Sequence, residues 1–278
     1  MDRRKTVTLI ILCLILILCG CGKTEPAAEQ TVIDVNDFNG MRVGVNLAWE
    51  ADYLLTGRKD IKLYRYDSLA DMLMALKSHK LDAFALDHVT LAVITSQISG
   101  VEKVEPPLGK PAYAAYFNAN EQELMDDFNA FLSDWKASEE YSEFIRSQDE
   151  FDGVNYQGTY YPEAEDGKSI VVAYIMEGFP RSFYNTVTDE PDGFDVQVIR
   201  RWAYERGYKI DFVGTAYEDM EMGTLTGRYQ VGTGYNSTLY KDDAVAAGIL
   251  VSDPYGDVSI YLCHMTGDSI DMEGYEFE

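Results

Sequence analysis

Strand-like and helix-like patterns of apolar residues alternate in the first third of the chain. Short strands are predicted at 41–45, 61–66 and 81–86. Between the last two, Ser68 and Asp71 have the spacing of a capping box, and apolar residues follow at helical spacing. This β-α-β order favours an α/β fold with a parallel or mixed sheet covered by helices.

The middle of the chain is predicted to contain a strand, two helices and a linker. Residues 112–118 have strand character, and Asn120 and Glu123 open an amphipathic helix. The apolar stripe of this helix consists of Leu124, Phe128, Phe131, Leu132 and Trp135. A shorter helix is predicted near 138–145. Residues 149–167 have mixed polarity and no period, which indicates a linker.

The α/β alternation restarts after this linker. A helix around Trp202 is predicted to end at Gly207, because glycine readily takes the left-handed conformation that terminates helices. The other predicted elements are strands at 169–174, 210–213, 229–232 and 257–264, and a short helix before Gly227. The pattern therefore predicts two α/β units.

The first 21 residues have the pattern of a bacterial lipoprotein signal peptide. Three basic residues precede an apolar run at 7–18, which is too short to span a bilayer comfortably and fits a secretory signal. The run ends in Leu-Cys-Gly-Cys, which resembles a lipobox with lipidation at Cys21. We therefore predict a signal peptide at 1–20, a polar tether at 21–35, and a lipid anchor on the outer face of the bacterial cytoplasmic membrane. The alternative is a plain signal anchor.

Composition and charge exclude one class of function. The 278 residues are 46% hydrophobic, and 47 acidic residues against 23 basic ones give a formal net charge of -24. Outside the first five residues there is no cluster of Lys and Arg. Because nucleic-acid binding depends on a basic surface, we expect no nucleic-acid partner.

Cysteine and histidine are too few and too scattered for a disulfide framework or a metal site. Cys13 and Cys19 leave with the predicted signal, Cys21 would carry lipid, and Cys263 is left without a partner. The three histidines are scattered, and neither CxxC nor HExxH occurs. We expect no metal and no cofactor.

Several ordered motifs resemble the bacterial extracellular solute-binding proteins of the polar-amino-acid type. In the first half, the similar segments are 37–45, 66–68 with the following helix, 80–83, 112–117 and 121–145. In the second half, they are Phe179, Pro180, Phe183, 193–196, Gly227, Thr238 and 252–255. The resemblance implies a two-lobed periplasmic-binding-protein-like fold, with a mixed sheet covered by helices in each lobe.

The order of the lobes is the reverse of the family's. The resemblance implies a second-lobe-like unit at 36–118, tail helices packing on the first lobe at 119–148, the linker at 149–167, a first-lobe-like unit at 168–265, and the start of a further hinge or truncated repeat at 266–278. Two explanations remain open. One is circular permutation, which is tolerated where chain termini lie close together. The other is a truncated tandem array, because residues 271–277 resemble residues 37–43.

The resemblance also implies a ligand between the lobes, with its ammonium on carboxylates and its carboxylate on an arginine and backbone N–H groups. Asp87 lies five residues after Asp82, where the family has the carboxylate that holds the ammonium. The other interpretation of Asp87 is a solvated aspartate at a strand end. The full set of implied ligand-binding residues is Asp87, Asn46, Trp49, Phe179, Thr233, Gly234, Asn236, Thr238 and Lys241.

Some of these positions depart from the family pattern. Lys241 replaces an arginine and lacks the planar fork that clamps a carboxylate. Ile175 replaces an aspartate, and Gly178 replaces an aromatic platform for which the neighbouring Phe179 can substitute. Trp49 either stacks on the ligand or packs in the core, and the core is the favoured interpretation.

The predicted function is capture of a small polar ligand, an amino acid or a related compound, for an ABC-type importer by hinge closure. One alternative is a degenerate sensory or vestigial module from a truncated array. A distant alternative is a dehydratase-like enzyme on the same fold, with Asp87 or Glu177 as the acid or base.

Overall fold

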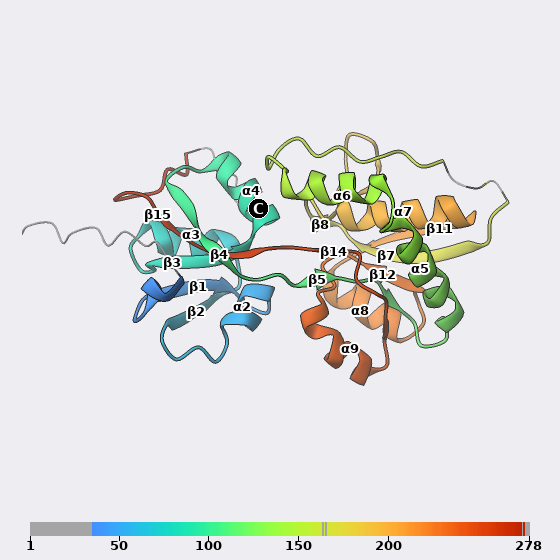
Figure 1. The fold of residues 1–278 in the computed structure, drawn as a ribbon, viewed down its shortest axis with the longest axis horizontal. Helices are drawn as coiled ribbons and strands as arrows, with labels where there is room; N and C mark the ends of the chain where they lie inside the picture. The colour runs from blue at the N-terminus through green and yellow to red at the C-terminus, as the bar shows by residue number, and fades with distance from the viewer. Residues whose placement is uncertain (1–34, 163, 165, 274, 276–278) are drawn as a thin grey trace, which may run out of the picture. The chain divides into compact units, whose positions relative to one another are not determined.

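A computed structural model of the chain describes residues 35–162, 164, 166–273 and 275. The predicted signal peptide, Cys21 and all but the last residue of the tether lie outside the described residues. The described part contains two five-stranded sheets, each with its own helices (Figure 1). We call these two units lobe A and lobe B.

Lobe A is built on the sheet β2-β1-β3-β15-β4. Its strands are β1 (Arg42–Asn46), β2 (Lys62–Tyr66), β3 (Ala83–Asp87), β4 (Val101–Gly109) and β15 (Ile260–Met265). Its helices are α2 (Glu50–Leu55), α3 (Leu69–Lys77) and α4 (His88–Gln97), preceded by the 3-10 helix η1 (Val35–Phe38). Strands β1, β2 and β3 are parallel, whereas β15 is antiparallel to both of its neighbours.

Lobe B is built on the sheet β11-β7-β12-β6-β13. Its strands are β6 (Tyr116–Phe117), β7 (Ser169–Ile175), β11 (Lys209–Thr215), β12 (Val231–Thr233) and β13 (Leu250–Val251). Its helices are α5 (Gln122–Trp135), α6 (Glu139–Asp149), α7 (Phe194–Arg206), α8 (Tyr217–Leu225) and α9 (Lys241–Ala247), with the 3-10 helix η2 (Thr238–Tyr240) before α9. A small sheet of β8 (Glu177–Gly178), β9 (Ser182–Asn185) and β10 (Glu190–Asp192) follows β7.

Local signals in the sequence account for several of these boundaries. The Ser68 hydroxyl accepts a hydrogen bond from the Asp71 N–H and caps α3, as the capping spacing predicts. Gly207 ends α7 with a φ of 70°, a left-handed conformation that glycine adopts without steric cost. All five residues of the predicted apolar stripe of α5 are buried. The predicted α/β fold with two lobes, each a mixed sheet covered by helices, is confirmed.

Two strands connect the lobes. The predicted single strand at 112–118 is in fact two: β5 (Ala112–Tyr113) pairs with β14 (Gly256–Asp257), and β6 belongs to the sheet of lobe B. Ala114 and Ala115 separate them because the chain passes from one sheet to the other at this point. The pair β5 and β14 runs antiparallel along the crossing between the two sheets (Figure 1).

The strand predicted at 257–264 lies in the other sheet from the one expected. The strand β15 lies between β3 and β4 in the sheet of lobe A. The first-lobe-like unit predicted at 168–265 therefore extends too far, because its last residues belong to lobe A. Leu262 and Cys263 are both buried, as expected of a central strand covered on both faces. An apolar run of this kind predicts a buried strand but not the sheet that receives it.

The residues after β15 pack onto lobe A. Ile270 and Met272 are buried in the same cluster as Leu73 of α3 and Ile94 of α4. The main chain of Asp271 exchanges two hydrogen bonds with that of Ser99. The described part of 266–278 therefore packs into the core of lobe A.

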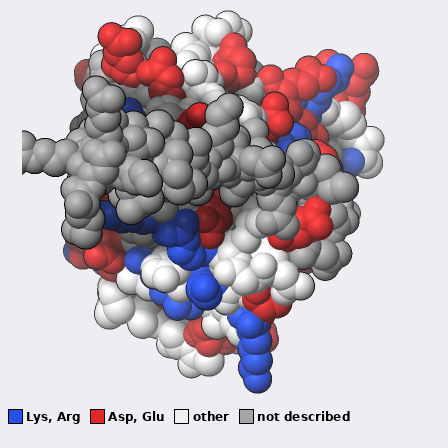
Figure 2. Space-filling view, turned by 90° about the vertical axis from the view of Figure 1, so that its left-hand side faces the viewer, with Lys and Arg blue, Asp and Glu red and all other residues white. Residues whose placement is uncertain are grey.

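The linker at 149–167 begins later than predicted, because α6 continues through Asp149. Tyr156 of this linker packs among aromatic side chains: its ring centroid lies 5.1–6.4 Å from those of Phe179, Phe183 and Phe194. Among the described residues, no helix is both long and apolar enough to cross a membrane. On the face drawn in Figure 2, basic and acidic side chains are intermixed.

Candidate functional site

The carboxyl ends of the parallel strands in both lobes lead to one buried cluster of polar side chains. Asn46 and Asp87 end β1 and β3 in lobe A, and Thr233 ends β12 in lobe B. Ligands of α/β proteins characteristically bind at this end of a parallel sheet. The backbone N–H of Ala114, on the crossing, donates to the carbonyl of Asn236 at 3.0 Å and holds the lobe B loop against it.

Tyr113, on the crossing strand β5, contacts both lobes. Its hydroxyl donates a 2.8 Å hydrogen bond to Oε1 of Glu50, in the first turn of α2. The guanidinium of Arg181, between β8 and β9, lies over its ring at 3.8 Å from the ring centroid. A single buried tyrosine therefore links a carboxylate of lobe A to a cation of lobe B.

Arg181 and Asp195 form a completely buried ion pair in lobe B. Their side chains are 1% and 0% exposed, and Nη2 of Arg181 lies 2.5 Å from Oδ1 of Asp195. Nε donates to the other carboxylate oxygen at 3.3 Å, and Nη1 donates to Gln148 at the end of α6. Burial is the largest single effect and lowers the pKa of Arg181, but the charge and hydrogen bond of Asp195 together with the effects of Tyr113 and Tyr255 hold that pKa above its ordinary value.

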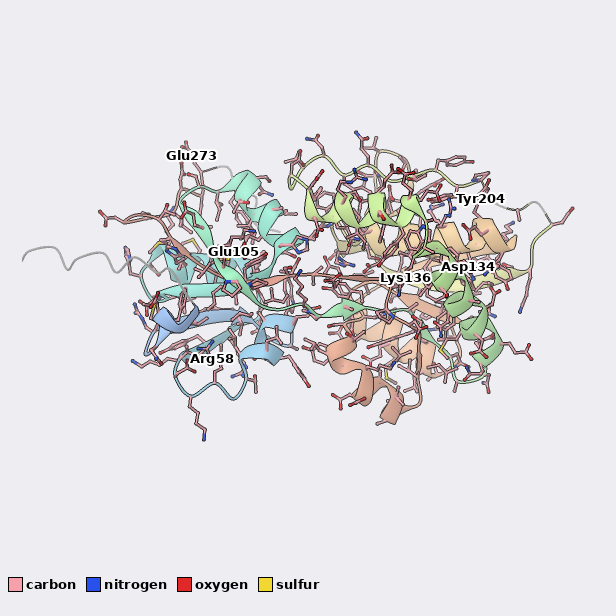
Figure 3. All side chains as sticks on the ribbon, viewed as in Figure 1. Arg58, Glu105, Asp134, Lys136, Tyr204 and Glu273 are labelled. Carbon is pink, nitrogen blue, oxygen red and sulfur yellow. The ribbon has the colours of Figure 1, made fainter. Side chains whose placement is uncertain are left out.

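Glu50 is a buried carboxylate in a cluster where carboxylates outnumber the one guanidinium. The residue is 8% exposed. Burial and then the charge of Asp87 raise its pKa to about 7, against the opposing effects of its Tyr113 hydrogen bond and of Arg181. Peripheral charges such as Asp134 and Glu273 lie at the outside of the molecule, in contrast to this cluster (Figure 3).

Asp87 lies in the cluster but also has a structural role. It is 5% exposed, so it is not the solvated strand-end aspartate of the alternative interpretation. Its Oδ1 accepts hydrogen bonds from the N–H groups of Val89 and Thr90 at 3.0 and 2.9 Å, which makes Asp87 the N-cap of α4. The hydrogen bonds formed among the described residues use only this oxygen, so Oδ2 is the oxygen left for a ligand.

The loop after β12 is buried and already holds an anion from the protein itself. Thr233 and Asn236 are 0% exposed, and Gly234 has a φ of 115° that favours glycine. The backbone N–H of Tyr235, in the middle of this loop, donates to Oδ2 of Asp195 at 2.9 Å. One backbone N–H group of this loop is thus occupied by an internal carboxylate.

Two amide side chains in the cluster have unused acceptors. Among the described residues, neither Oδ1 of Asn46 nor Oδ1 of Asn236 has a hydrogen-bond partner, although both atoms are buried. Nδ2 of Asn236 donates to the carbonyl of Gly232. Oγ1 of Thr238 accepts a hydrogen bond from the N–H of Ala112 on the crossing strand, so this threonine helps to join the loop to the crossing.

Three of the sequence-predicted residues have exposed side chains in the structure. Trp49 is 38% exposed at the N-terminus of α2, so the favoured core interpretation is wrong. Phe179 is also 38% exposed and packs on Phe151 and Phe183. Lys241 is exposed at the first residue of α9.

The sequence did not reveal four residues that organise the cluster: Glu50, Tyr113, Arg181 and Tyr235. Arg181 offered one clue, as a lone basic residue inside the otherwise apolar and aromatic stretch around Phe179 and Phe183. Glu50 offered none, because an acidic residue in the first turn of a helix is ordinarily solvated.

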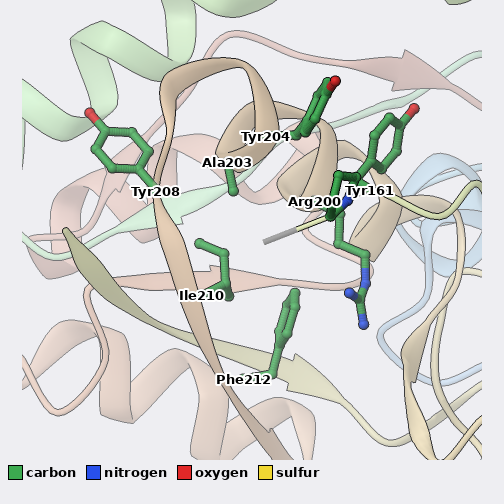
Figure 4. A pocket seen from close by; sticks show the side chains of 8 residues that line it. Tyr161, Arg200, Ala203, Tyr204, Tyr208, Ile210 and Phe212 are labelled. Atoms are coloured by element: carbon green, nitrogen blue, oxygen red, sulfur yellow. The ribbon is translucent and has the colours of Figure 1, made fainter. Parts of the chain in front are cut away.

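A shallow pocket on lobe B is separate from this cluster (Figure 4). Its cavity volume is about 10 Å³, which is the space for about one water molecule. Its lining residues are Tyr161, Pro162, Arg200, Ala203, Tyr204, Tyr208, Ile210 and Phe212, which include none of the predicted site residues. Among the described residues, no group of His, Cys, Asp and Glu is arranged to hold a metal ion.

No protein-family model matches the sequence, and no curated protein matches it. Solved structures with similar folds include the ligand-binding component of an ABC-type import system from Staphylococcus aureus with zinc bound, at 9% identity and a TM-score of 0.41. The similarity covers 82% of this chain and 66% of that chain, slightly under two thirds of its length.

Two further similar structures are an ancestral protein and a transporter component. The ancestral amino acid-binding protein AncCDT-1, a precursor of cyclohexadienyl dehydratase, has 10% identity and a TM-score of 0.42, with 83% of each chain covered. A phosphate-binding protein of a phosphate ABC transporter from Streptococcus pneumoniae TIGR4 has 12% identity and a TM-score of 0.39, covering 82% of this chain and 89% of that chain. At these values the similarities identify no function.

Proposed function

We propose that the chain is a lipid-anchored, extracellular solute-binding protein of the polar-amino-acid type. It captures a small polar ligand, an amino acid or a related compound, and presents it to an ABC-type importer when the lobes close. The observation that carries the proposal is the cluster formed where the strand ends of both lobes meet, around Glu50, Asp87, Tyr113 and Arg181.

The charges of the cluster favour a cationic group in the ligand. Three carboxylates, those of Glu50, Asp87 and Asp195, accompany the single guanidinium of Arg181. That guanidinium is already committed to Asp195 and Gln148. A ligand ammonium would compensate the remaining carboxylates through charge-assisted hydrogen bonds.

The crossing between the lobes supports hinge closure. Among the described residues, two short strands of two residues each, β5 and β14, pair along it. Hinges of this kind need only a few residues that absorb the change in backbone angles. We therefore propose that the lobes move as bodies about residues 110–115 and 252–259, and that the chain binds rather than transforms its ligand.

The proposal is tested by thermal unfolding of the purified chain with amino acids, polyamines and small carboxylates. A ligand at about 100 times its Kd should add about 2.7 kcal/mol to the free energy of unfolding, which raises Tm by roughly 5–10 °C. Asp87→Asn should weaken binding at least about tenfold, because it removes a charge in contact with the ammonium. Asparagine is itself a good N-cap, so the fold should remain intact.

The matched control is Asp268→Asn, which removes an exposed carboxylate and should leave binding unchanged. If no compound shifts Tm, or if both aspartate variants bind as the unaltered chain does, the proposed site is wrong.

A further inference from the structure

We propose that Tyr235 is a built-in size limit of the site, so that the ligand is a compact ammonium compound without an aromatic or similarly bulky group. This inference rests on the proposed function, because it concerns the ligand of the same site. It is carried by the position of the Tyr235 ring relative to Gly178, Tyr113 and the lobe A carboxylates.

The backbone directs this ring to one place. Tyr235 has a φ of 59°, in the left-handed region that residues other than glycine seldom adopt. Its N–H is bound to Asp195, and the preceding Gly234 has no room for a side chain, since a Cβ there would lie 2.8 Å from Ile175. Sparsely populated backbone conformations that their surroundings enforce are concentrated at functional sites.

The ring occupies the space beside Gly178. A Cβ added to Gly178 would lie only 2.4 Å from Cε2 of Tyr235, so no side chain fits at 178 while the ring is there. The Tyr235 hydroxyl donates a 3.0 Å hydrogen bond to the Gly178 carbonyl, which fixes the ring over the end of β8. The Tyr235 ring therefore fills the space that a side chain at position 178 would need.

This volume lies at the centre of the candidate site. The Tyr235 ring meets the ring of Tyr113 edge to face, with centroids 6.4 Å apart. Burial and then the charge of Asp87 raise the pKa of Tyr235, and the charge of Glu50 acts in the same direction. The ring therefore lies against Tyr113, whose hydroxyl is bound to Glu50, one of the carboxylates proposed to receive the ammonium, and a bulky substituent on the ligand would meet it.

The test compares Tyr235→Gly, Tyr235→Phe and the unaltered chain. Glycine suits the left-handed backbone, and phenylalanine keeps the ring but loses the hydrogen bond. The probes are two pairs that differ by one phenyl ring: L-alanine with L-phenylalanine, and ethylamine with phenethylamine. The control is Tyr204→Gly, which removes a ring that is 50% exposed on α7 (Figure 3).

We expect the unaltered chain to bind the smaller member of each pair at least about tenfold more tightly than the larger member, and Tyr235→Phe and Tyr204→Gly to do the same. Tyr235→Gly should lose that preference. Preference ratios that are equal in Tyr235→Gly and the unaltered chain would overturn the inference while leaving the proposed function in place.

A second measurement separates the two hypotheses where the four probes fail to bind. p-Cresol, which has the structure of the tyrosine side chain, should raise the Tm of Tyr235→Gly and not that of the unaltered chain, because it refills the vacated space. Rescue by p-cresol without binding of any amine would support the ring-sized space and contradict the proposed function. Binding of amines without rescue, at unchanged preference, would contradict the inference alone.

Discussion

Replacement of Arg181 by methionine should lower the free energy of unfolding by about 3–5 kcal/mol, since it leaves the carboxylate of Asp195 buried and unpaired. Asp195 is 0% exposed, so solvent cannot compensate its charge. The same change removes the cation from the face of Tyr113, and with it one of the contacts that hold the crossing strand. Urea denaturation measures the loss.

The control for this prediction is a partly exposed ion pair. Arg42 and Asp82 have side chains that are 37% and 34% exposed, so Arg42→Met should cost no more than about 1 kcal/mol. Arg181→Met combined with Asp195→Asn should be less destabilised than the sum of the two single variants. An Arg181→Met variant as stable as Arg42→Met would show that the pair is not buried in solution.

The pH dependence of stability should reveal Glu50. Its pKa is about 7 in the folded chain and close to 4.5 in the unfolded chain. As pH rises through this window the unfolded chain releases the proton while the folded chain retains it, so stability falls with rising pH. The difference of about 2.5 pKa units corresponds to roughly 3 kcal/mol at pH 8, and Glu50→Gln should abolish that part of the fall.

The measurement is the urea midpoint of the unaltered chain and of Glu50→Gln between pH 4 and pH 8. The contributions of other titrating groups, such as His88, are present in both proteins and cancel in the comparison. Glu177→Gln, at an exposed glutamate, is the matched control and should follow the unaltered chain. Parallel curves for the unaltered chain and Glu50→Gln would contradict the burial of Glu50.

The sequence predicted the local elements better than their assembly. The period of apolar residues located β1, α3, β7 and α7, because each of these elements is determined by its own buried face. It could not assign β15 to lobe A, since an apolar run is equally suited to either sheet. The division of 112–118 into β5 and β6 was likewise invisible, as it depends on a passage between two sheets.

The candidate site was predictable only where it coincides with strand ends. Asp87 and Asn46 follow apolar runs, so their place in a parallel sheet could be inferred, but the role of Asp87 as the cap of α4 could not. Glu50 is buried by Tyr113, which is 63 residues away along the chain. Contacts of this range arise from the fold and leave no local pattern in the sequence.

The most direct test of the account is the distance between the lobes with and without ligand. Spin labels at Lys59→Cys in lobe A and Asp243→Cys in lobe B both occupy exposed positions. Cys13, Cys19 and Cys21 are replaced by serine, and Cys263 can remain because it is buried and burial raises the pKa of its thiol. Pulsed electron paramagnetic resonance then gives the distribution of distances.

If the lobes close on the ligand, a ligand found in the thermal screen shortens the mean distance by more than about 2 Å, and Asp87→Asn prevents the change at the same ligand concentration. A distribution that is identical with and without saturating ligand would contradict capture by hinge closure.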